Sequence, residues 1–261
     1  MTMTAEPTTE AGSHVAAVRP SIARLTSTEL RKLTDTRAGR WLLATIGLIT
    51  VGGAVMLLFV LDDADQTFAG FFVPSLAPAA LLLPVLGILS ITSEWTQRTA
   101  LTTYALVPRR ERVVLAKLAA VVLAALASVL VSLAVAAVGT LAAEATGGAG
   151  GWDGEWVLVP QAALSQMVWV LMGAGFGLLL INTPLAIVGY LLLPLVWGIL
   201  TTMISALRGA ANWLDLSTTL DPLNGSEVTA GQWGRLAVSV LVWVAVPLAA
   251  GMLRTLRREV S

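Results

Sequence analysis

The stretch VVLAKLAAVVLAALASVLVSLAVAAVGTL, residues 113–141, sets the class of this 261-residue protein. It contains one charged residue, Lys117, and exceeds the roughly 18 apolar residues that a helix needs to cross the hydrocarbon layer of a membrane. A helix can cross that layer because it satisfies its own backbone hydrogen bonds in a solvent that offers none. Residues 113–141 are therefore predicted to form a transmembrane helix.

The rest of the composition leads to the same interpretation. Hydrophobic residues make up 56% of the chain and charged residues 12%, whereas charged residues make up roughly 25% of soluble domains. Five further apolar runs are long enough to span a membrane. Together the six predicted spans are 41–60, 68–92, 113–141, 161–181, 184–205 and 232–253. The predicted fold class is all-α, a polytopic membrane protein with six transmembrane helices.

The fourth and fifth spans are separated only by Asn182 and Thr183. Thr183 followed by Pro184 is typical of an N-cap with proline at the first helical position, which favours two helices. One continuous, broken helix is the alternative.

Two segments precede the first span. Residues 1–21 lack hydrophobic periodicity and are predicted to be a disordered tail, ahead of a six-helix domain at 22–261. Within LTSTELRKL, residues 25–33, Thr26 and Glu29 match a capping box, with a leucine on each side as a hydrophobic staple. A short basic amphipathic helix is predicted to begin here and to lie at the membrane interface. A solvated helical lead-in is the alternative.

The basic residues predict the orientation in the membrane. Segments 1–40, 93–117 and 254–261 hold 14 of the 16 Lys and Arg residues, and Arg208 and Arg235 are the other two. Lys and Arg gather on the cytoplasmic side of membrane proteins. We therefore expect a multi-pass protein of the plasma membrane with both termini, and the connection after the second span, in the cytoplasm.

Several kinds of chemistry have no residues to support them. The chain has no Cys, its single His lies in the N-terminal tail at His14, and no phosphate-binding G-x-x-x-x-G-K-[ST] loop occurs. Every acidic residue falls outside the predicted hydrocarbon zone, so neither a zinc site nor an ion relay is indicated. Serines within spans, such as Ser128, Ser132 and Ser165, are expected to hydrogen-bond between helices. We expect no enzyme activity, no cofactor or metal in this chain, and no nucleic-acid partner.

Prolines and small residues interrupt the spans. The prolines are expected to bend their helices, either to shape a cavity or as a common feature of membrane helices. The small residues are expected to let helices approach closely. The positions are Pro74, Pro78, Pro84, Pro194 and Pro247, with Gly173, Gly175 and Gly177 in the fourth span. Between the fifth and sixth spans, residues 206–231 predict either short helices that dip into the outer leaflet or a plain surface loop.

The connection EWTQRTALTTYALVPRRERVVLAK, residues 94–117, is far longer than two neighbouring spans need. Helical character is expected up to Val107, because Pro108 disfavours helical geometry in the residue before it. The result is a short helix with an apolar aromatic side, followed by a basic turn. The basic residues alone could serve only to hold the loop inside and to contact anionic lipid, but that role does not account for the amphipathic helix.

Glu94, Thr99, Pro108, Arg112 and Lys117 resemble the cytoplasmic signature of ABC-2 type permeases, the membrane subunits of ATP-binding cassette exporters. That signature is a Glu, a Gly-Thr pair, then P-x-x-x-R and a Lys just inside the next span. The chain departs from it at residue 98, where an arginine stands in place of the usual glycine. The six-span layout, the leading helix and the outer segment extend the resemblance to about residues 22–258.

The resemblance implies that residues 94–107 form a coupling helix inserted in a groove of a separate ATPase subunit, which binds the ATP. A second copy of the chain, or a related permease, would complete the translocation path. The span interiors hint at an amphipathic or lipid-like cargo. The alternative is a membrane scaffold or sensor subunit that binds a regulatory protein without transport. The residues implied in coupling are Glu94, Trp95, Arg98, Thr99, Tyr104, Pro108, Arg109, Arg110, Arg112 and Lys117.

Overall fold

The computed structural model describes residues 21–96, 110–152 and 156–257, and this part of the chain is built from helices. The helices of the first half are α1 (Ile22–Asp35), α2 (Arg37–Val60), α3 (Phe68–Ser75), α4 (Ala77–Thr96) and α6 (Arg110–Thr146). Those of the second half are α7 (Leu158–Leu180), α8 (Thr183–Met203), α9 (Arg208–Leu214), α10 (Leu216–Leu220), α11 (Ala230–Val240) and α12 (Val246–Arg257). A π turn, Leu241–Ala245, joins α11 to α12.

Six helical stretches among the described residues are long and apolar enough to cross a membrane, which confirms the predicted number of spans. Each overlaps one predicted span. Their bounds are Arg37–Val60, Phe68–Ser93, Glu111–Thr146, Leu158–Leu180, Thr183–Met203 and Ala230–Leu256. Large apolar side chains stand on their outer faces, with Leu48 75% and Phe59 84% exposed. Such exposure is what a surface in contact with lipid requires.

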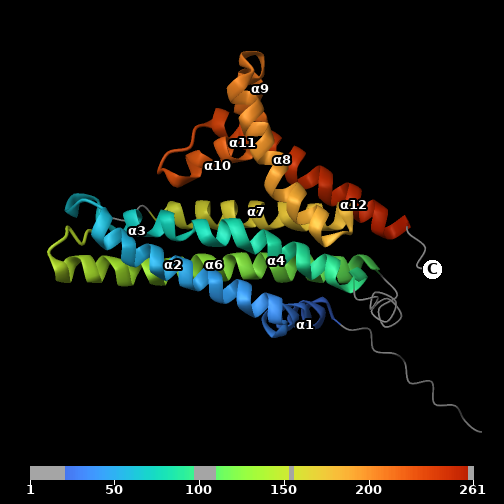
Figure 1. Ribbon diagram of the computed structural model, residues 1–261, viewed down its shortest axis with the longest axis horizontal. Coiled ribbons are helices and arrows are strands. Elements are labelled where there is room, and N and C mark those ends of the chain that lie inside the picture. Colours follow the sequence, from blue (N-terminus) through green and yellow to red (C-terminus); the bar gives the residue numbers. More distant parts are fainter. Residues whose placement is uncertain (1–20, 97–109, 153–155, 258–261) are drawn as a thin grey trace, which may run out of the picture.

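Two groups of helices make up the molecule. Figure 1 shows α2, α4, α6 and α7 running side by side along its long axis, while α8 and α11–α12 rise from one side and converge on the short helices α9 and α10. Helix α7 is central, because it packs against α4, α6, α8 and α12.

The central position of α7 depends on small residues. A Cβ added to Gly173 would lie 2.5 Å from the carbonyl oxygen of Pro84 on α4, and one added to Gly251 on α12 would lie 2.6 Å from the Cβ of Leu178 on α7. These distances leave no room for a side chain. The predicted packing role of the fourth-span glycines is confirmed at Gly173, where the two backbones approach closely.

The second predicted span consists of two helices that meet at Leu76, with a proline two residues away on either side. Side chains of neighbouring helices bond the carbonyls at this break. Ser132 Oγ on α6 donates to the Ser75 carbonyl at 3.0 Å, and Gln166 Nε2 on α7 donates to the Leu76 carbonyl at 2.9 Å. The predicted helix-to-helix bond is thus confirmed at Ser132 but is wrong at Ser128, whose hydroxyl donates to the Ala125 carbonyl of its own helix. The break is tolerated because its backbone is satisfied within the bundle.

A third proline, Pro84, frees a carbonyl deeper in α4. Proline has no backbone N–H, so the Ala80 carbonyl four residues earlier loses its partner within the helix. Tyr190 Oη on α8 donates to that carbonyl at 3.2 Å. The hydroxyl of α8 therefore replaces the bond that Pro84 removes.

The start of α1 differs from the prediction. Its N-cap is Ser21, whose hydroxyl accepts from the Arg24 N–H at 3.2 Å. The predicted capping box at Thr26 and Glu29, with its leucine staple, is therefore wrong. Both residues lie within α1, past its N-terminus. Their side chains are buried because they belong to the face of α1 that packs against α6.

The fourth and fifth spans are separate helices, as the capping pattern favoured. After α7 ends, Ile181 adopts a left-handed conformation with φ of 50°, which commonly terminates helices. Asn182, not the predicted Thr183, is the N-cap of α8, and its Oδ1 accepts from the Leu185 N–H at 3.0 Å.

Residues 206–231 contain the short helices α9 and α10, so the plain loop is excluded. These helices are attached to the last span. Trp243 Nε1 donates to the Leu214 carbonyl at 2.6 Å, and the hydroxyls of Thr219 and Ser239 lie 2.6 Å apart.

Candidate functional site

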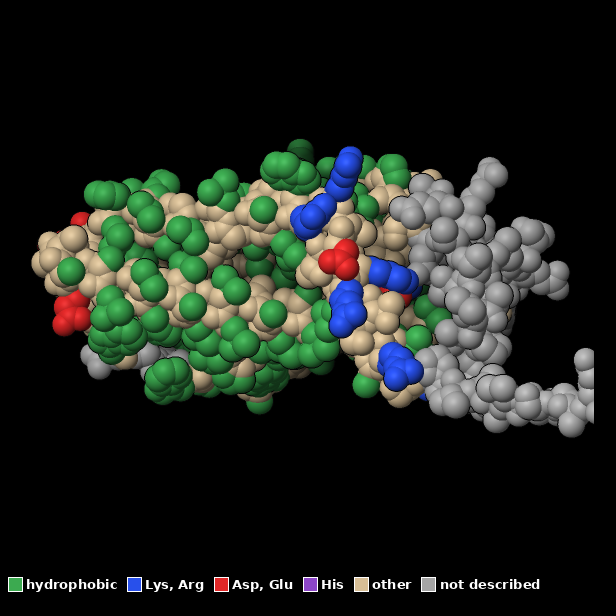
Figure 2. Space-filling model, turned by 90° about the horizontal axis from the view of Figure 1, so that it is seen from below, with side chains coloured by type: hydrophobic (Ala, Val, Ile, Leu, Met, Phe, Trp, Pro, Cys, Tyr) green, Lys and Arg blue, Asp and Glu red, His purple; other side chains and the backbone are tan. Residues whose placement is uncertain are grey.

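Charged side chains of the described residues gather towards the two ends of the bundle, with an apolar band between them (Figure 2). Acidic residues follow the end of α2 at Asp62, Asp63 and Asp65. The opposite end, which we call the basic end, contains α1, the last turns of α4 and the first turns of α6. The connection at 97–109, between α4 and α6, lies outside the described residues.

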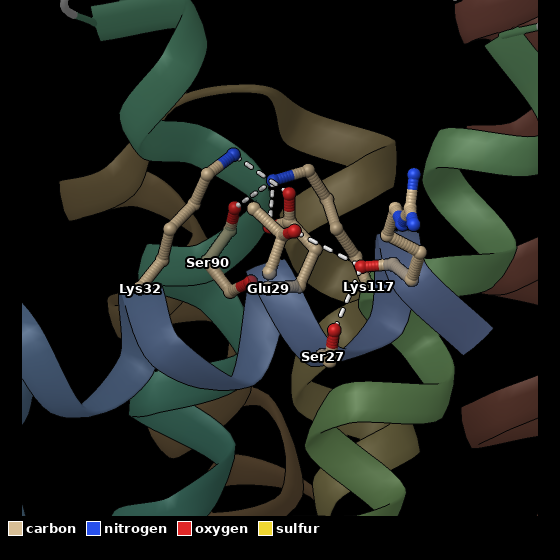
Figure 3. Close-up of polar contacts among 7 residues, drawn as sticks. Ser27, Glu29, Lys32, Ser90 and Lys117 are labelled. Carbon is tan, nitrogen blue, oxygen red and sulfur yellow. Dashed lines mark hydrogen bonds and ion pairs between the residues drawn. The ribbon is translucent and has the colours of Figure 1, made fainter. Parts of the chain in front are cut away.

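A buried ion cluster lies at the basic end. Lys117 Nζ on α6 is 2.8 Å from Glu29 Oε2 on α1, and the two side chains are only 5% and 7% exposed. The other carboxylate oxygen, Oε1, is 2.6 Å from Lys32 Nζ, whose side chain is 46% exposed. Figure 3 shows both lysine amines beside the Glu29 carboxylate. One carboxylate therefore joins a buried cation to a cation at the surface.

The same cluster reaches α4. Lys117 Nζ also donates to the Ser90 carbonyl at 2.9 Å. Ser90 lies two turns before α4 ends at Thr96, and Lys117 lies two turns after α6 begins at Arg110. The two helices that carry the 97–109 connection are thus held at a fixed separation close to its ends, and α1 is bound to both.

The sequence of α1 places Glu29 for this contact. Thr26, Glu29 and Leu33 recur at spacings of three and four residues and are the buried residues of the helix. Residues at these spacings share one face of an α-helix. That face packs against α6, where Val113, Val114 and Ala116 are also buried. Glu29 is the one charged residue on this buried face of α1. Its carboxylate therefore meets Lys117, the only buried cation among the described side chains of α6.

Further polar contacts tie the neighbouring helix ends together. On α4, Thr92 Oγ1 lies 2.7 Å from Thr183 Oγ1, at the start of α8. On α12, Arg254 Nη1 donates to the Leu179 carbonyl in the last turn of α7. A cation at a helix C-terminus is favourable, because the last carbonyls have no partner within the helix. At the basic end, the ends of all these helices are connected by side chains.

Only part of the predicted coupling set lies among the described residues. Glu94 and Trp95 lie in the last turn of α4, and Arg110 is the first residue of α6; the structure describes their backbone alone. Arg112 is half-buried in the first turn of α6. The remaining predicted residues before α6 lie outside the described part: Arg98, Thr99, Tyr104, Pro108 and Arg109.

Lys117 is placed inside the bundle and not on the surface of the basic end, since it is 4% exposed. Its amine contacts Glu29 and the Ser90 carbonyl within the chain. In this arrangement Lys117 acts by positioning the helices next to the connection. The resemblance alone did not distinguish that role from direct contact with a partner subunit.

Sequence reasoning missed Glu29 as a site residue and assigned it to a capping box. A signal for its role was present. Lys117 lies inside a predicted span, and a cation there requires an acidic partner or a carbonyl. The sequence does not say which of the acidic residues on the same side is that partner, because the choice depends on how α1 packs.

Among residues 21–96, 110–152 and 156–257, no group of three or more His, Cys, Asp or Glu side chains could hold a metal ion. The charged groups of the basic end connect helices to one another. A search of protein-family models and a search of curated proteins find no match to this chain.

Proposed function

We propose that this chain is the permease subunit of an ATP-binding cassette exporter of the ABC-2 type. A separate ATPase subunit binds the cytoplasmic connection at 97–109 and drives the change between inward-open and outward-open states. A second copy of the chain, or a related permease, completes the path. The observation that carries the proposal is the buried cluster of Glu29 and Lys117, which fixes the helices on both sides of that connection.

The physical argument concerns the transmission of force. A subunit in the cytosol can move membrane helices only through a rigid element that it grips and that is attached to those helices. A buried ion pair is weak as a source of net stability but costly to break, so it holds the helices that it joins at one separation. A displacement of the 97–109 connection would therefore move α1, α4 and α6 together.

The packing of α7 supports the next step. Both α4 and α6 contact α7, and α7 contacts α8 and α12. A movement that starts at the basic end would reach the second group of helices through this central helix. Closely packed interfaces such as that of Gly173 with Pro84 transmit such a shift because they cannot compress.

The orientation follows from charge. The basic end faces the cytoplasm under the positive-inside rule, which puts the connection where an ATPase can reach it. The basic residues of the connection would then set the register and choice of partner, while its aromatic residues supply the buried anchors. In this proposal α1 is the interfacial helix, with the exposed Arg24, Arg31 and Lys32 towards the anionic leaflet.

Affinity purification from the native host in mild detergent tests the proposal directly. We expect an ATPase with a phosphate-binding loop to co-elute with the chain in equal amounts. In the variant that combines Arg98→Ala with Tyr104→Ala, the ATPase should be lost or its ATP hydrolysis should no longer depend on the permease. The chain itself should remain inserted and folded. The pair Thr102→Ala and Thr103→Ala changes the same connection without removing an anchor and serves as the control.

Two results would contradict the proposal. The first is unchanged ATPase retention and unchanged hydrolysis in the Arg98→Ala and Tyr104→Ala variant. The second is co-elution of a cytoplasmic protein that has no nucleotide-binding loop, which would favour the scaffold or sensor subunit instead.

A further inference from the structure

An apolar cavity lies beside the ion cluster and takes no part in the coupling proposal. It has a volume of about 570 Å³ and lies between α1, α2, α4 and α6. Its lining is almost entirely apolar: Leu30, Leu33, Leu43, Ile46, Gly47, Ala79, Leu83, Leu86, Leu123, Ala124, Ala127 and Val131, with the hydroxyls of Thr34, Thr50, Ser128 and Ser132. Figure 2 shows a hollow on this face, next to the basic side chains.

The cavity is not suited to water. A buried water needs two to four polar partners. Two of the lining hydroxyls are already engaged, since Ser128 donates to the Ala125 carbonyl and Ser132 to the Ser75 carbonyl. An empty cavity of this size would forfeit the dispersion contacts of its whole lining. An apolar occupant is therefore expected.

The depth of the cavity corresponds to one leaflet of a bilayer. On α6 its lining runs from Leu123 to Ser132, which is about 14 Å along the helix axis at 1.5 Å per residue. The hydrocarbon layer is about 30 Å thick. The cavity begins less than two turns beyond Lys117 and ends about 22 Å from it along α6, at 1.5 Å per residue. It therefore opens in the half of the layer next to the basic end and extends to the middle of the layer. It is open to the side, because Leu123 and Val131 are 45% and 51% exposed.

Cations stand at the end of the cavity that meets the membrane surface. Arg40 precedes Leu43 and Gly47 by three and seven residues, which places it on the same face of α2 as these two lining residues. On α1, Arg31 stands between the lining residues Leu30 and Thr34. Both arginines are exposed, and the nearby exposed Asp35 offsets only part of their charge. Arginine binds phosphate through two parallel hydrogen bonds.

We propose that this cavity binds one acyl chain of an anionic phospholipid, whose phosphate is held by Arg31 and Arg40. A second copy of the chain suits the cavity less well. A two-fold interface centred on this face would gather the exposed arginines of both chains in one apolar contact, and this accumulation of like charge is unfavourable. A second hollow between α2 and α6, lined by Val51, Val138 and others, continues towards the acidic end. The charged residues that follow its lining in the sequence, Asp62 and Glu144, are acidic and would repel a phosphate, so the proposal does not extend to it.

The glycines of α2 offer a matched pair of variants. An added Cβ at Gly47 or at Gly52 meets nothing within 4 Å, so both positions accept a side chain without a clash. Gly47 lines the cavity and Gly52 does not. Gly47→Leu should fill the space meant for the acyl chain, whereas Gly52→Leu should leave it open. A third variant, Arg31→Gln with Arg40→Gln, removes the proposed phosphate ligands from exposed positions and leaves the cavity unchanged.

The test uses the full chain in phosphatidylcholine vesicles that contain a trace of photoactivatable phosphatidylglycerol, or of photoactivatable phosphatidylcholine with the same acyl chains. After illumination, labelled peptides are identified by mass spectrometry. We expect phosphatidylglycerol to label residues 43–50 and 123–132 about tenfold more than phosphatidylcholine does. Gly47→Leu should abolish this labelling and Gly52→Leu should keep it. The double arginine variant should reduce phosphatidylglycerol labelling to the phosphatidylcholine level.

Three outcomes would overturn the proposal. Equal labelling by the two lipids would remove the headgroup selectivity, and unchanged labelling in Gly47→Leu would place the acyl chain elsewhere. Efficient disulfide formation between two chains that carry Gly47→Cys would show that a second copy occupies this face. None of these outcomes depends on ATP or on an ATPase subunit. The lipid-binding proposal can therefore fail while the exporter proposal stands, and the exporter proposal can fail while lipid binding stands.

Discussion

Lys117 is the residue on which the basic end depends, because it is a buried cation in a transmembrane helix whose other charged residues stand near its two ends. The free-energy cost of burying its charge is offset by two contacts of Nζ: the Glu29 carboxylate at 2.8 Å and the Ser90 carbonyl at 2.9 Å. Removing one partner of a buried pair leaves the other without compensation, and this is far more destabilising than removing both. The pair therefore predicts a specific pattern in a set of variants.

Lys117→Met should destabilise the folded chain by about 3–5 kcal/mol, since it leaves the Glu29 carboxylate buried with only the partly exposed Lys32 as its partner. In thermal unfolding followed by tryptophan fluorescence in micelles, the midpoint should fall by on the order of 10 °C. Combining Lys117→Met with Glu29→Leu should restore most of the loss, because an apolar pair of similar volume replaces the ions. If the double variant is less stable than Lys117→Met alone, the two residues do not act as a pair.

Lys32→Met is the matched control for this prediction. Lys32 binds the same carboxylate at 2.6 Å, but its side chain is 46% exposed. Exposed ion pairs contribute about 0–1 kcal/mol, so the unfolding midpoint should change by at most a few degrees. An effect of Lys32→Met as large as that of Lys117→Met would mean that burial does not distinguish the two cations.

The sequence shows that Lys117 needs a partner but not which one. Four acidic residues that the charge pattern assigns to the same side stand near a span or at its end: Glu29, Asp35, Glu94 and Glu111. Choosing among them requires the rotation of α1 about its axis, which is set by the packing of Leu33 and Thr26 against the bundle. Sequence reasoning instead treated Thr26 and Glu29 as local backbone caps, because the capping box and the buried face share the same three-residue spacing.

Among the helices, α4 shows what prolines predict and what they leave open. The sequence predicts bends in the second span, and the structure has a break at Leu76. The side chains that bond the carbonyls of this span come from positions about 57 to 110 residues away in the chain, namely Ser132, Gln166 and Tyr190. Such partners are set by the packing of α6, α7 and α8 around α4. They could not be read from the local pattern around each proline.

Tyr190→Phe should destabilise the bundle by about 1–3 kcal/mol, because it leaves the Ala80 carbonyl buried without its donor. In the background of Pro84→Ala, residue 84 regains an N–H that can bond the same carbonyl within α4. Tyr190→Phe should then cost much less. Unfolding midpoints of the two single variants and the double variant in micelles measure this coupling. Equal costs of Tyr190→Phe in both backgrounds would contradict the assigned role of the hydroxyl.

The contact between α4 and α7 predicts a second effect, at Gly173. A Cβ there would lie 2.5 Å from the Pro84 carbonyl oxygen, so Gly173→Ala should force the helices apart and cost about 1–3 kcal/mol. Gly52→Ala is the control, since its Cβ meets nothing within 4 Å. The control should be neutral, or should stabilise the chain by about 0.5–1 kcal/mol through helix propensity. The midpoints of the two variants should therefore shift in opposite directions, or only that of Gly173→Ala should fall.

At the scale of the whole molecule, the number of spans was predictable because it depends on one property, the length of each apolar run. Helices that cross a hydrocarbon layer must be long and apolar, so six runs in the sequence gave six spans in the structure. The grouping of α8 to α12 on one side of α7 was not predictable in this way. It depends on contacts between distant residues, such as Trp243 with the Leu214 carbonyl, and on where single glycines let backbones meet.

Orientation is the property of the whole chain that the proposed function needs most, and the absence of native cysteines makes it directly testable. Thr102→Cys, in the connection, should react with an impermeant maleimide only after cells are permeabilised. Ala64→Cys, exposed beside the acidic residues that follow α2, should react in intact cells. The reason is that 14 of 16 basic residues belong to segments on the side of the connection, and Lys and Arg near span ends are retained in the cytoplasm. The reverse pattern of labelling would put the connection outside the cell, where no cytoplasmic ATPase could bind it, and the exporter proposal would fail.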